Sequence, residues 1–222
     1  MIADGQIRSR SRVEQHGEVF TSEREVNAML DLVLQETERI DSRFLEPACG
    51  TGNFLIEILC RKLKVVLRRY RKNQSDYEKY AFIAVSSLYG IDILEDNVME
   101  CRARLFERFD CEYSKLFGEN CQETFRDAIR FLLQKNILCG DALTLKTNAG
   151  EPIVFSEWAI VSDTQVKRRD FAFDEILAGH NKQTSLACFA EKAKYDRESQ
   201  AFIPAPVAEF PLTDFAGVVT YE

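Results

Sequence analysis

The amino-acid sequence predicts an α/β fold in which a mainly parallel sheet is flanked by helices. Three short apolar segments, residues 42–47, 87–92 and 136–143, have the length and composition of buried strands. Segments with apolar residues at helical spacing separate them. Because strands that alternate with helices build parallel sheets through right-handed crossovers, this order of elements predicts the fold class.

Further elements follow from local patterns. Ser22 and Glu25 have the spacing of a capping box, which predicts that a helix begins there. Predicted helices cover residues 22–40, 53–70, 94–109, 121–135 and a short stretch at 169–178. A fourth strand is predicted at 152–158 and a last one at 217–221.

The chain of 222 residues is long enough for one domain with a sizeable core. Residues 1–15 are polar, basic and unpatterned, so we expect a flexible segment. Residues 16–222 are expected to form a single domain, with a motif-bearing core at 16–160 and an irregular part at 161–222. No apolar run is long enough to span a bilayer, and no signal-type segment is present, so a cytoplasmic protein is expected.

The cysteine and histidine content predicts no metal site. Seven cysteines occur without any CxxC pair, and there are only two histidines, without ligand-like spacing. Buried thiols in a reducing compartment explain the cysteines. Catalysis by histidine is disfavoured because the chain has only two histidines.

The net charge of −7 argues against a protein that coats nucleic acid without specificity, but DNA binding needs only one basic face. Basic residues gather in two places, each of which is either a solvated surface or a site of phosphate or partner contact. They are Arg61, Lys62, Lys64, Arg68, Arg69, Arg71 and Lys72, and then Lys167, Arg168 and Arg169.

The most informative stretch is the turn after the first strand. Two glycines, Gly50 and Gly52, let a ligand approach the backbone, and the following helix offers unpaired N–H groups. The first three strands each end on an acid, namely Glu46, Asp92 and Asp141. Parallel strands bind ligands outside their carboxyl ends, so one crevice is expected to hold all three. Glu46 can accept from an ammonium or hydroxyl, and Asp92 from both hydroxyls of a ribose.

The string Glu-Pro-Ala-Cys-Gly-Thr-Gly-Asn-Phe resembles motif I of the S-adenosylmethionine-dependent adenine-N6 DNA methyltransferases of restriction–modification systems. The resemblance implies a Rossmann-like methyltransferase fold with S-adenosyl-L-methionine as cofactor and DNA as substrate. It implies that the methionine part is held by Glu46, Pro47, Ala48, Cys49, Gly50, Thr51, Gly52, Asn53 and Phe54.

Three more motifs occur in the expected order. Gly17 to Thr21 is similar to motif X, which implies that Phe20 packs near the cofactor and that Thr21 contacts its carboxylate. Asp92 and Ile93 match motif II, which binds the ribose, and Asp141 and Ala142 match motif III, which accepts from the adenine amino group. The order X, I, II, III is that of the gamma group of these enzymes.

The catalytic motif of the family is altered. Adenine methyltransferases carry Asn/Asp/Ser-Pro-Pro-aromatic after the fourth strand, whereas this chain has no Pro-Pro and shows Ser156, Glu157 and Trp158 at that place. In one interpretation these three residues form a variant site, with Glu157 accepting from the target amine and Trp158 stacking on an extruded base. In the other, the loop has lost catalysis and Trp158 is an ordinary core or loop aromatic.

Two functions therefore compete. The chain is either a DNA methyltransferase of a restriction–modification system or a non-catalytic, methyltransferase-like subunit of a larger DNA-modification or defence complex. The last third of the chain contains no recognisable target-recognition domain. Either a partner, namely a specificity or restriction subunit, supplies target recognition, or the chain is a shortened relative of the family. A nicotinamide-dependent oxidoreductase is disfavoured because the Gly-x-Gly-x-x-Gly spacing is absent.

Overall fold

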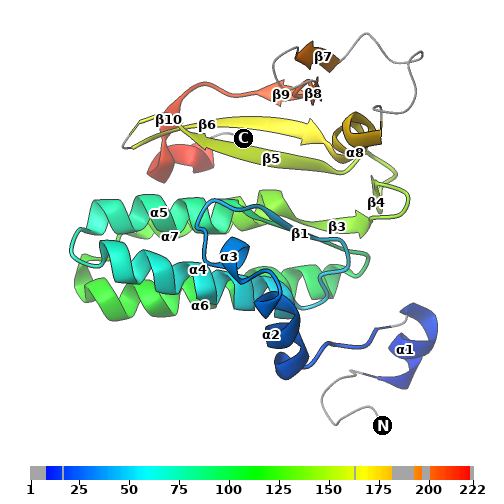
Figure 1. Cartoon of the computed structure of the whole chain (residues 1–222), viewed down its shortest axis with the longest axis horizontal. Coiled ribbons are helices and arrows are strands. Elements are labelled where there is room, and N and C mark those ends of the chain that lie inside the picture. The colour runs from blue at the N-terminus through cyan, green and yellow to red at the C-terminus, as the bar shows by residue number, and fades with distance from the viewer. Residues whose placement is uncertain (1–8, 17, 163, 182–192, 197–200, 221–222) are drawn as a thin grey trace.

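The computed structural model describes residues 9–16, 18–162, 164–181, 193–196 and 201–220. A layer of long helices and a second, antiparallel sheet lie on opposite sides of the molecule, with the strands of a small, mostly parallel sheet between them (Figure 1). The fold is therefore mixed α/β, as the sequence predicts.

The first sheet has the order β1-β2-β3-β4. Strands β1 (Phe44–Glu46), β2 (Leu88–Asp92) and β3 (Ile137–Asp141) are parallel, with Leu45 opposite Tyr89 and Asp92 opposite Cys139. The short β4 (Lys146–Thr147) returns antiparallel to β3. The three acid-terminated strands of the prediction are confirmed, and β1 lies at the edge of the sheet.

The helices before and between the strands are α1 (Arg10–His16), α2 (Glu23–Asp31), α3 (Leu34–Thr37), α4 (Asn53–Tyr70), α5 (Gln74–Ser86), α6 (Glu95–Phe117), the 3-10 helix η1 (Gly118–Asn120) and α7 (Glu123–Asn136). Helix α1 overlaps the stretch 1–15, for which the sequence predicts no regular structure. Ser22 and Glu25 form the predicted capping box. The helix predicted at 22–40 is instead broken, because after Leu32 the chain turns and brings Thr37 and Ile40 into the core, leaving Leu34 exposed.

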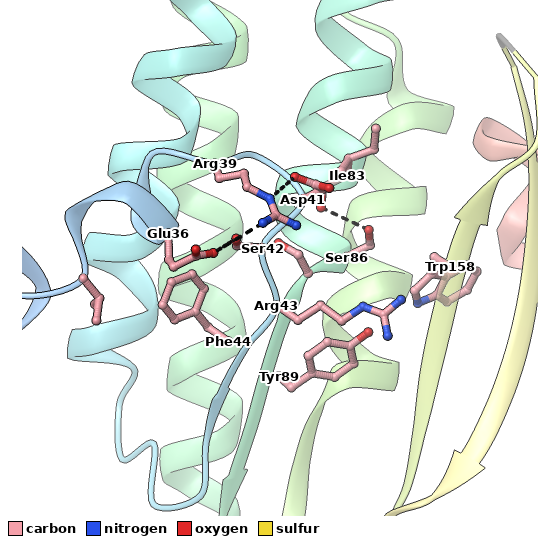
Figure 2. A pocket seen from close by; sticks show the side chains of 12 residues that line it. Glu36, Arg39, Asp41, Ser42, Arg43, Phe44, Ile83, Ser86, Tyr89 and Trp158 are labelled. Carbon is pink, nitrogen blue, oxygen red and sulfur yellow. Dashed lines mark hydrogen bonds and ion pairs between the residues drawn. The ribbon is translucent and has the colours of Figure 1, made fainter. Parts of the chain in front are cut away.

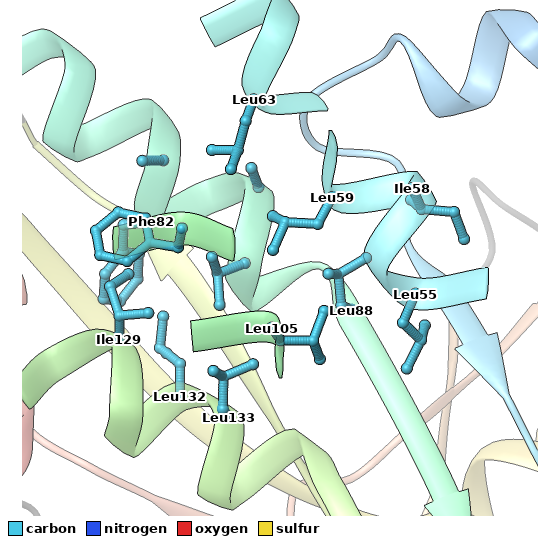
Figure 3. Close-up of a cluster of buried hydrophobic side chains, with 14 of the residues drawn as sticks. Leu55, Ile58, Leu59, Leu63, Phe82, Leu88, Leu105, Ile129, Leu132 and Leu133 are labelled. Atoms are coloured by element: carbon cyan, nitrogen blue, oxygen red, sulfur yellow. The ribbon is translucent and has the colours of Figure 1, made fainter. Parts of the chain in front are cut away.

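The main hydrophobic core lies among the helices α4 to α7 and the adjacent face of β2. Figure 3 shows how side chains from these elements meet, including Leu55, Leu59, Leu88, Leu105 and Leu132, all fully buried. Lys62 is also fully buried, where it donates to the Ser42 carbonyl and the Ser87 hydroxyl. Burial lowers the pKa of Lys62 to about 7.

The predicted fourth strand forms, but the prediction that it belongs to the parallel sheet is wrong. Strand β5 (Val154–Ile160) pairs antiparallel with β6 (Gln165–Ala172), and β10 (Thr213–Asp214) and β9 (Ala208–Glu209) extend this second sheet. Only residues 161–164 separate β5 from β6, so the two strands pair as neighbours along the chain, and β5 belongs to this second sheet rather than to the edge of β1. Ser156 and Trp158 face Asp170 and Arg168 across the pair.

Two other predictions at the C-terminal end are also wrong. Residues 169–172 belong to β6, so the predicted helix begins only at α8 (Phe173–Asn181). Residues 215–220 form the 3-10 helix η2 (Phe215–Thr220) rather than a strand, because Phe215 and Val218 turn inward to pack on α7. Strands β7 (Ala193–Asp196) and β8 (Ala201–Pro204) form a separate hairpin.

Candidate functional site

The candidate site is built on the tight turn that joins β1 to α4. The Cys49 N–H donates to the Ile91 carbonyl at 2.8 Å, which ties the turn to β2. Gly52 has φ +90°, and a Cβ placed there would lie 2.6 Å from the Cys101 Sγ. Helix α6 therefore packs directly against the turn, and no side chain fits at Gly52.

Asp92 holds this turn from the end of β2. Its Oδ2 accepts from the Gly50 N–H at 2.8 Å, and its Oδ1 accepts from the Leu94 N–H at 2.9 Å and from Asn97 Nδ2 at 3.2 Å. A carboxylate oxygen can accept two hydrogen bonds, and Oδ2 has this single partner among the described residues. Asp92 thus stabilises the turn while keeping an acceptor position for a ligand hydroxyl.

Phe20 and Thr21 lie against the same turn. Asn53 Nδ2 donates to the Thr21 carbonyl at 3.0 Å, and a Cβ at Gly50 would lie 3.3 Å from the Phe20 ring. The segment before α2 therefore forms a wall beside the Gly-rich turn. The structure brings together the residues for which the motif X and motif I resemblances predicted a shared site.

A polar network that the sequence did not reveal surrounds the turn. Asn97 Nδ2 also donates to Glu18 at 2.7 Å, and Arg12 pairs with Glu18 at 2.6 Å and with Asp96 at 2.5 Å. Arg104 donates to the Thr51 carbonyl and hydroxyl and to Asn53. The missed signal was spacing on α6: Asn97, Cys101 and Arg104 recur at intervals of four and three residues, so one helix face meets the turn.

Glu46 and Asp141 occupy different environments. Glu46 is half-buried, and burial raises the pKa of its carboxyl above the ordinary value. Asp141, two strands away from β1, accepts from the Leu143 N–H at 2.8 Å, and such backbone bonds lower its pKa. Of the neighbouring candidates, Pro47, Ala48 and Ile93 are exposed, whereas Phe54 and Ala142 pack against apolar clusters. A ligand ammonium would suit Glu46 best.

Ser156, Glu157 and Trp158 lie away from this turn, on β5. Trp158 is 8% exposed and packs edge-on against Phe82 and Phe131. The Ser156 hydroxyl donates to Asp170 at 2.8 Å, within a buried network that includes Arg168. Glu157 pairs with Arg43, which precedes β1, and with Arg169. These residues therefore gather near the amino end of β1, and Trp158 has the core packing of the second interpretation.

Within each of the two basic clusters some residues are buried and others are at least partly exposed. Arg61 and Lys62 are buried on α4, and Arg168 forms a buried ion pair with Asp170 at 2.6 Å. Five basic residues remain exposed around the end of α4. They are Lys64, Arg68, Arg69, Arg71 and Lys72.

The described part of the chain contains no group of three or more histidine, cysteine, aspartate or glutamate side chains placed to hold a metal ion. No helix within the described ranges has both the length and the apolar character that crossing a bilayer requires.

Comparison with known proteins gives one informative similarity. The chain is 31% identical, over 122 residues, to a candidate type II restriction enzyme and methyltransferase of Methanocaldococcus jannaschii. The match covers 52% of this chain and 9% of that protein, so the chain corresponds to a small part of its relative. No protein-family model matches the sequence, and no solved structure matches the fold.

Proposed function

We propose that this chain binds S-adenosyl-L-methionine and acts in adenine-N6 methylation of DNA within a restriction–modification system. The observation that carries the proposal is the meeting of Phe20, Thr21, the 47–53 turn and Asp92 at the carboxyl end of β1 and β2. A Rossmann-like methyltransferase arrangement would place the cofactor there. The relative from M. jannaschii supports the general class of function.

The residues present fit the cofactor. Burial raises the pKa of the half-buried Glu46 carboxyl, and a ligand ammonium beside it would lower that pKa by stabilising the charged form. Asp92 Oδ2 keeps an acceptor position for a ribose hydroxyl. Backbone N–H groups at the start of α4 would receive a carboxylate. When bound, the cofactor supplies an activated methyl group on its sulfonium. The chain's own part is to bind and orient the donor, with no metal or covalent nucleophile required.

A second candidate is a non-catalytic, methyltransferase-like subunit of a larger DNA-modification or defence complex. The observation that favours it is the engagement of Ser156, Glu157 and Trp158 in packing and ion pairs of the second sheet. In that role the chain would keep the cofactor as a structural ligand or sensor. A partner subunit would then supply the chemistry that acts on DNA.

Calorimetric titration with S-adenosylmethionine and S-adenosylhomocysteine tests the shared part of both candidates. We expect micromolar binding that Glu46→Gln weakens about tenfold, since a charge-assisted hydrogen bond contributes ~1.5–3 kcal/mol. Glu38→Gln is the matched control, because Glu38 is exposed and its replacement changes the net charge by the same amount. Absence of binding, or equal weakening by both variants, would refute the cofactor assignment.

Methyl transfer to adenine-containing duplex DNA then separates the two candidates. Incorporation of label from the methyl group into DNA by the purified chain supports an active enzyme. Transfer that appears only after a partner subunit is added supports the second candidate.

A further inference from the structure

A cavity of about 560 Å³ lies at the amino ends of β1 and β2. Figure 2 shows that its wall is made by the segment leading into β1, the end of α5, and side chains of β2 and β5. Phe44, the first residue of β1, and Ser87, which directly precedes β2, both line it. The candidate cofactor turn follows the carboxyl end of β1, so the cavity lies at the other end of the strands. More than half of the residues that line it are charged or polar, and its volume is that of a small-ligand site.

The charged side chains on one side of this cavity are paired with one another. Arg39 forms ion pairs with Glu36 at 3.8 Å and with Asp41 at 3.0 Å. The Ser42 hydroxyl also donates to Glu36. Two carboxylates share one guanidinium here, so an anion is not expected to bind on this side.

The opposite side of the cavity, next to β5, has the reverse charge balance. Arg43 pairs with Glu157 at 2.5 Å, and Arg169 pairs with the same carboxylate at 2.6 Å. Two guanidiniums thus share one carboxylate, and this group keeps a net positive charge. The Tyr89 hydroxyl is already used, because it donates to the Ser156 carbonyl at 3.3 Å. An anion would therefore be attracted to the Arg43 side of the cavity.

A buried donor without an acceptor lies beside Arg43. Trp158 lines the cavity and is 8% exposed, and its Nε1 has no hydrogen-bond partner among the described residues. In Figure 2 the indole nitrogen points toward the Arg43 guanidinium, which can only donate. Leaving a buried N–H without an acceptor is costly. One anionic oxygen placed between the two groups would accept from both of them.

We propose that this cavity binds a small carboxylate or phosphate ester, whose anionic oxygen lies between Trp158 Nε1 and the Arg43 guanidinium. Hydrogen bonds to an ionised acceptor are stronger than neutral ones, and a guanidinium can hold a carboxylate or phosphate with two N–H groups. Phe44, Ile83 and Tyr89 supply apolar wall beside this position. The ligand therefore carries an apolar ring or chain next to its anionic group.

Trp158 is the sole tryptophan of the chain, so nitrogen-15 NMR spectra contain one indole N–H signal, which reports directly on this site. The probes are benzoate and phenyl phosphate, and their neutral controls are benzamide and benzyl alcohol. We expect at least one of the anions to shift the indole signal saturably, with a Kd of about 1 mM or tighter. The neutral compounds should bind about tenfold more weakly, because they lack the charge that Arg43 receives. The tighter of the two anions identifies the anionic group.

Two variants, titrated by calorimetry with the tighter anion, test the residues that hold it. Arg43→Met removes the guanidinium and should weaken binding about tenfold, and Trp158→Phe keeps a ring in the core but removes the N–H and should weaken binding about fivefold. Arg24→Met is the matched control, because Arg24 is exposed on α2 and its replacement changes the net charge by the same amount.

The proposal is overturned if no anion shifts the indole signal, which would mean that water alone meets the N–H. Equal binding of the anions and their neutral analogues would also overturn it, and so would equal affinities of Arg43→Met and Arg24→Met. The titrations with the unaltered chain decide the question even where a variant fails to fold. The inference goes beyond the proposed function, and every measurement is made without S-adenosylmethionine, so its outcome is independent of the cofactor assignment.

Discussion

Replacement of Gly52 by alanine should damage the candidate site more than any other single-methyl change in the turn. The new Cβ would meet the Cys101 Sγ at 2.6 Å, and alanine would have to adopt φ +90°. The matched control is Gly150→Ala, because Gly150 has φ +84° and no atom within 4 Å of its Cβ position. The control isolates the cost of backbone conformation, which is about 1–2 kcal/mol for a left-handed residue.

Gly52→Ala adds an overpacking cost of about 1–3 kcal/mol to that conformational cost. We therefore expect a loss of about 2–5 kcal/mol in the free energy of unfolding, measured by urea denaturation. A Gly52→Ala/Cys101→Ala double variant removes the clash. Its loss in the free energy of unfolding should therefore be about 1–3 kcal/mol smaller than the sum of the two single losses. Equal losses for Gly52→Ala and Gly150→Ala, or no recovery in the double variant, would show that α6 does not pack against the turn as described.

Three further predictions concern charged groups. The pKa of buried Lys62 is about 7 in the fold, against an ordinary value of 10.5. Between these two pH values Lys62 binds a proton in the unfolded chain but not in the folded one. The free energy of unfolding therefore rises with pH, by at most about 1.4 kcal/mol per pH unit. Lys62→Met should remove this rise in urea unfolding curves recorded from pH 6.5 to 9, and an unchanged slope would contradict the assignment. Cofactor affinity should weaken on acidification as Glu46, whose pKa burial raises above 4.5, takes up a proton; calorimetry from pH 7.5 to 5 tests this, with Glu46→Gln expected to be flat. Asp170→Ala leaves Arg168 buried without its carboxylate and should cost about 3–5 kcal/mol in urea denaturation, whereas a loss under 1 kcal/mol would count against the buried pair.

Local patterns in the sequence determined much of the fold around the candidate site. The capping box at Ser22, the strands that end on Glu46, Asp92 and Asp141, and the helix after the Gly-rich turn were all predictable. These features depend on residues close together along the chain, namely caps, turn glycines and hydrophobic periodicity. The sequence order of the acids was enough to expect one sheet edge, since parallel strands share their direction.

The tertiary structure alone decided which segments pair and which charges are buried. The apolar pattern of 154–160 fits a parallel or an antiparallel strand equally well, and pairing with β6 through a four-residue connection determined the outcome. That choice moved Trp158 into the core and left the outer edge of β1 without a partner in the described structure. The burial of Lys62 and Arg168 could not be predicted either. The Ser42 carbonyl and the Ser87 hydroxyl, which accept from Lys62, and the Phe210 ring, which covers Arg168, are distant in sequence, and only the folded chain brings them together.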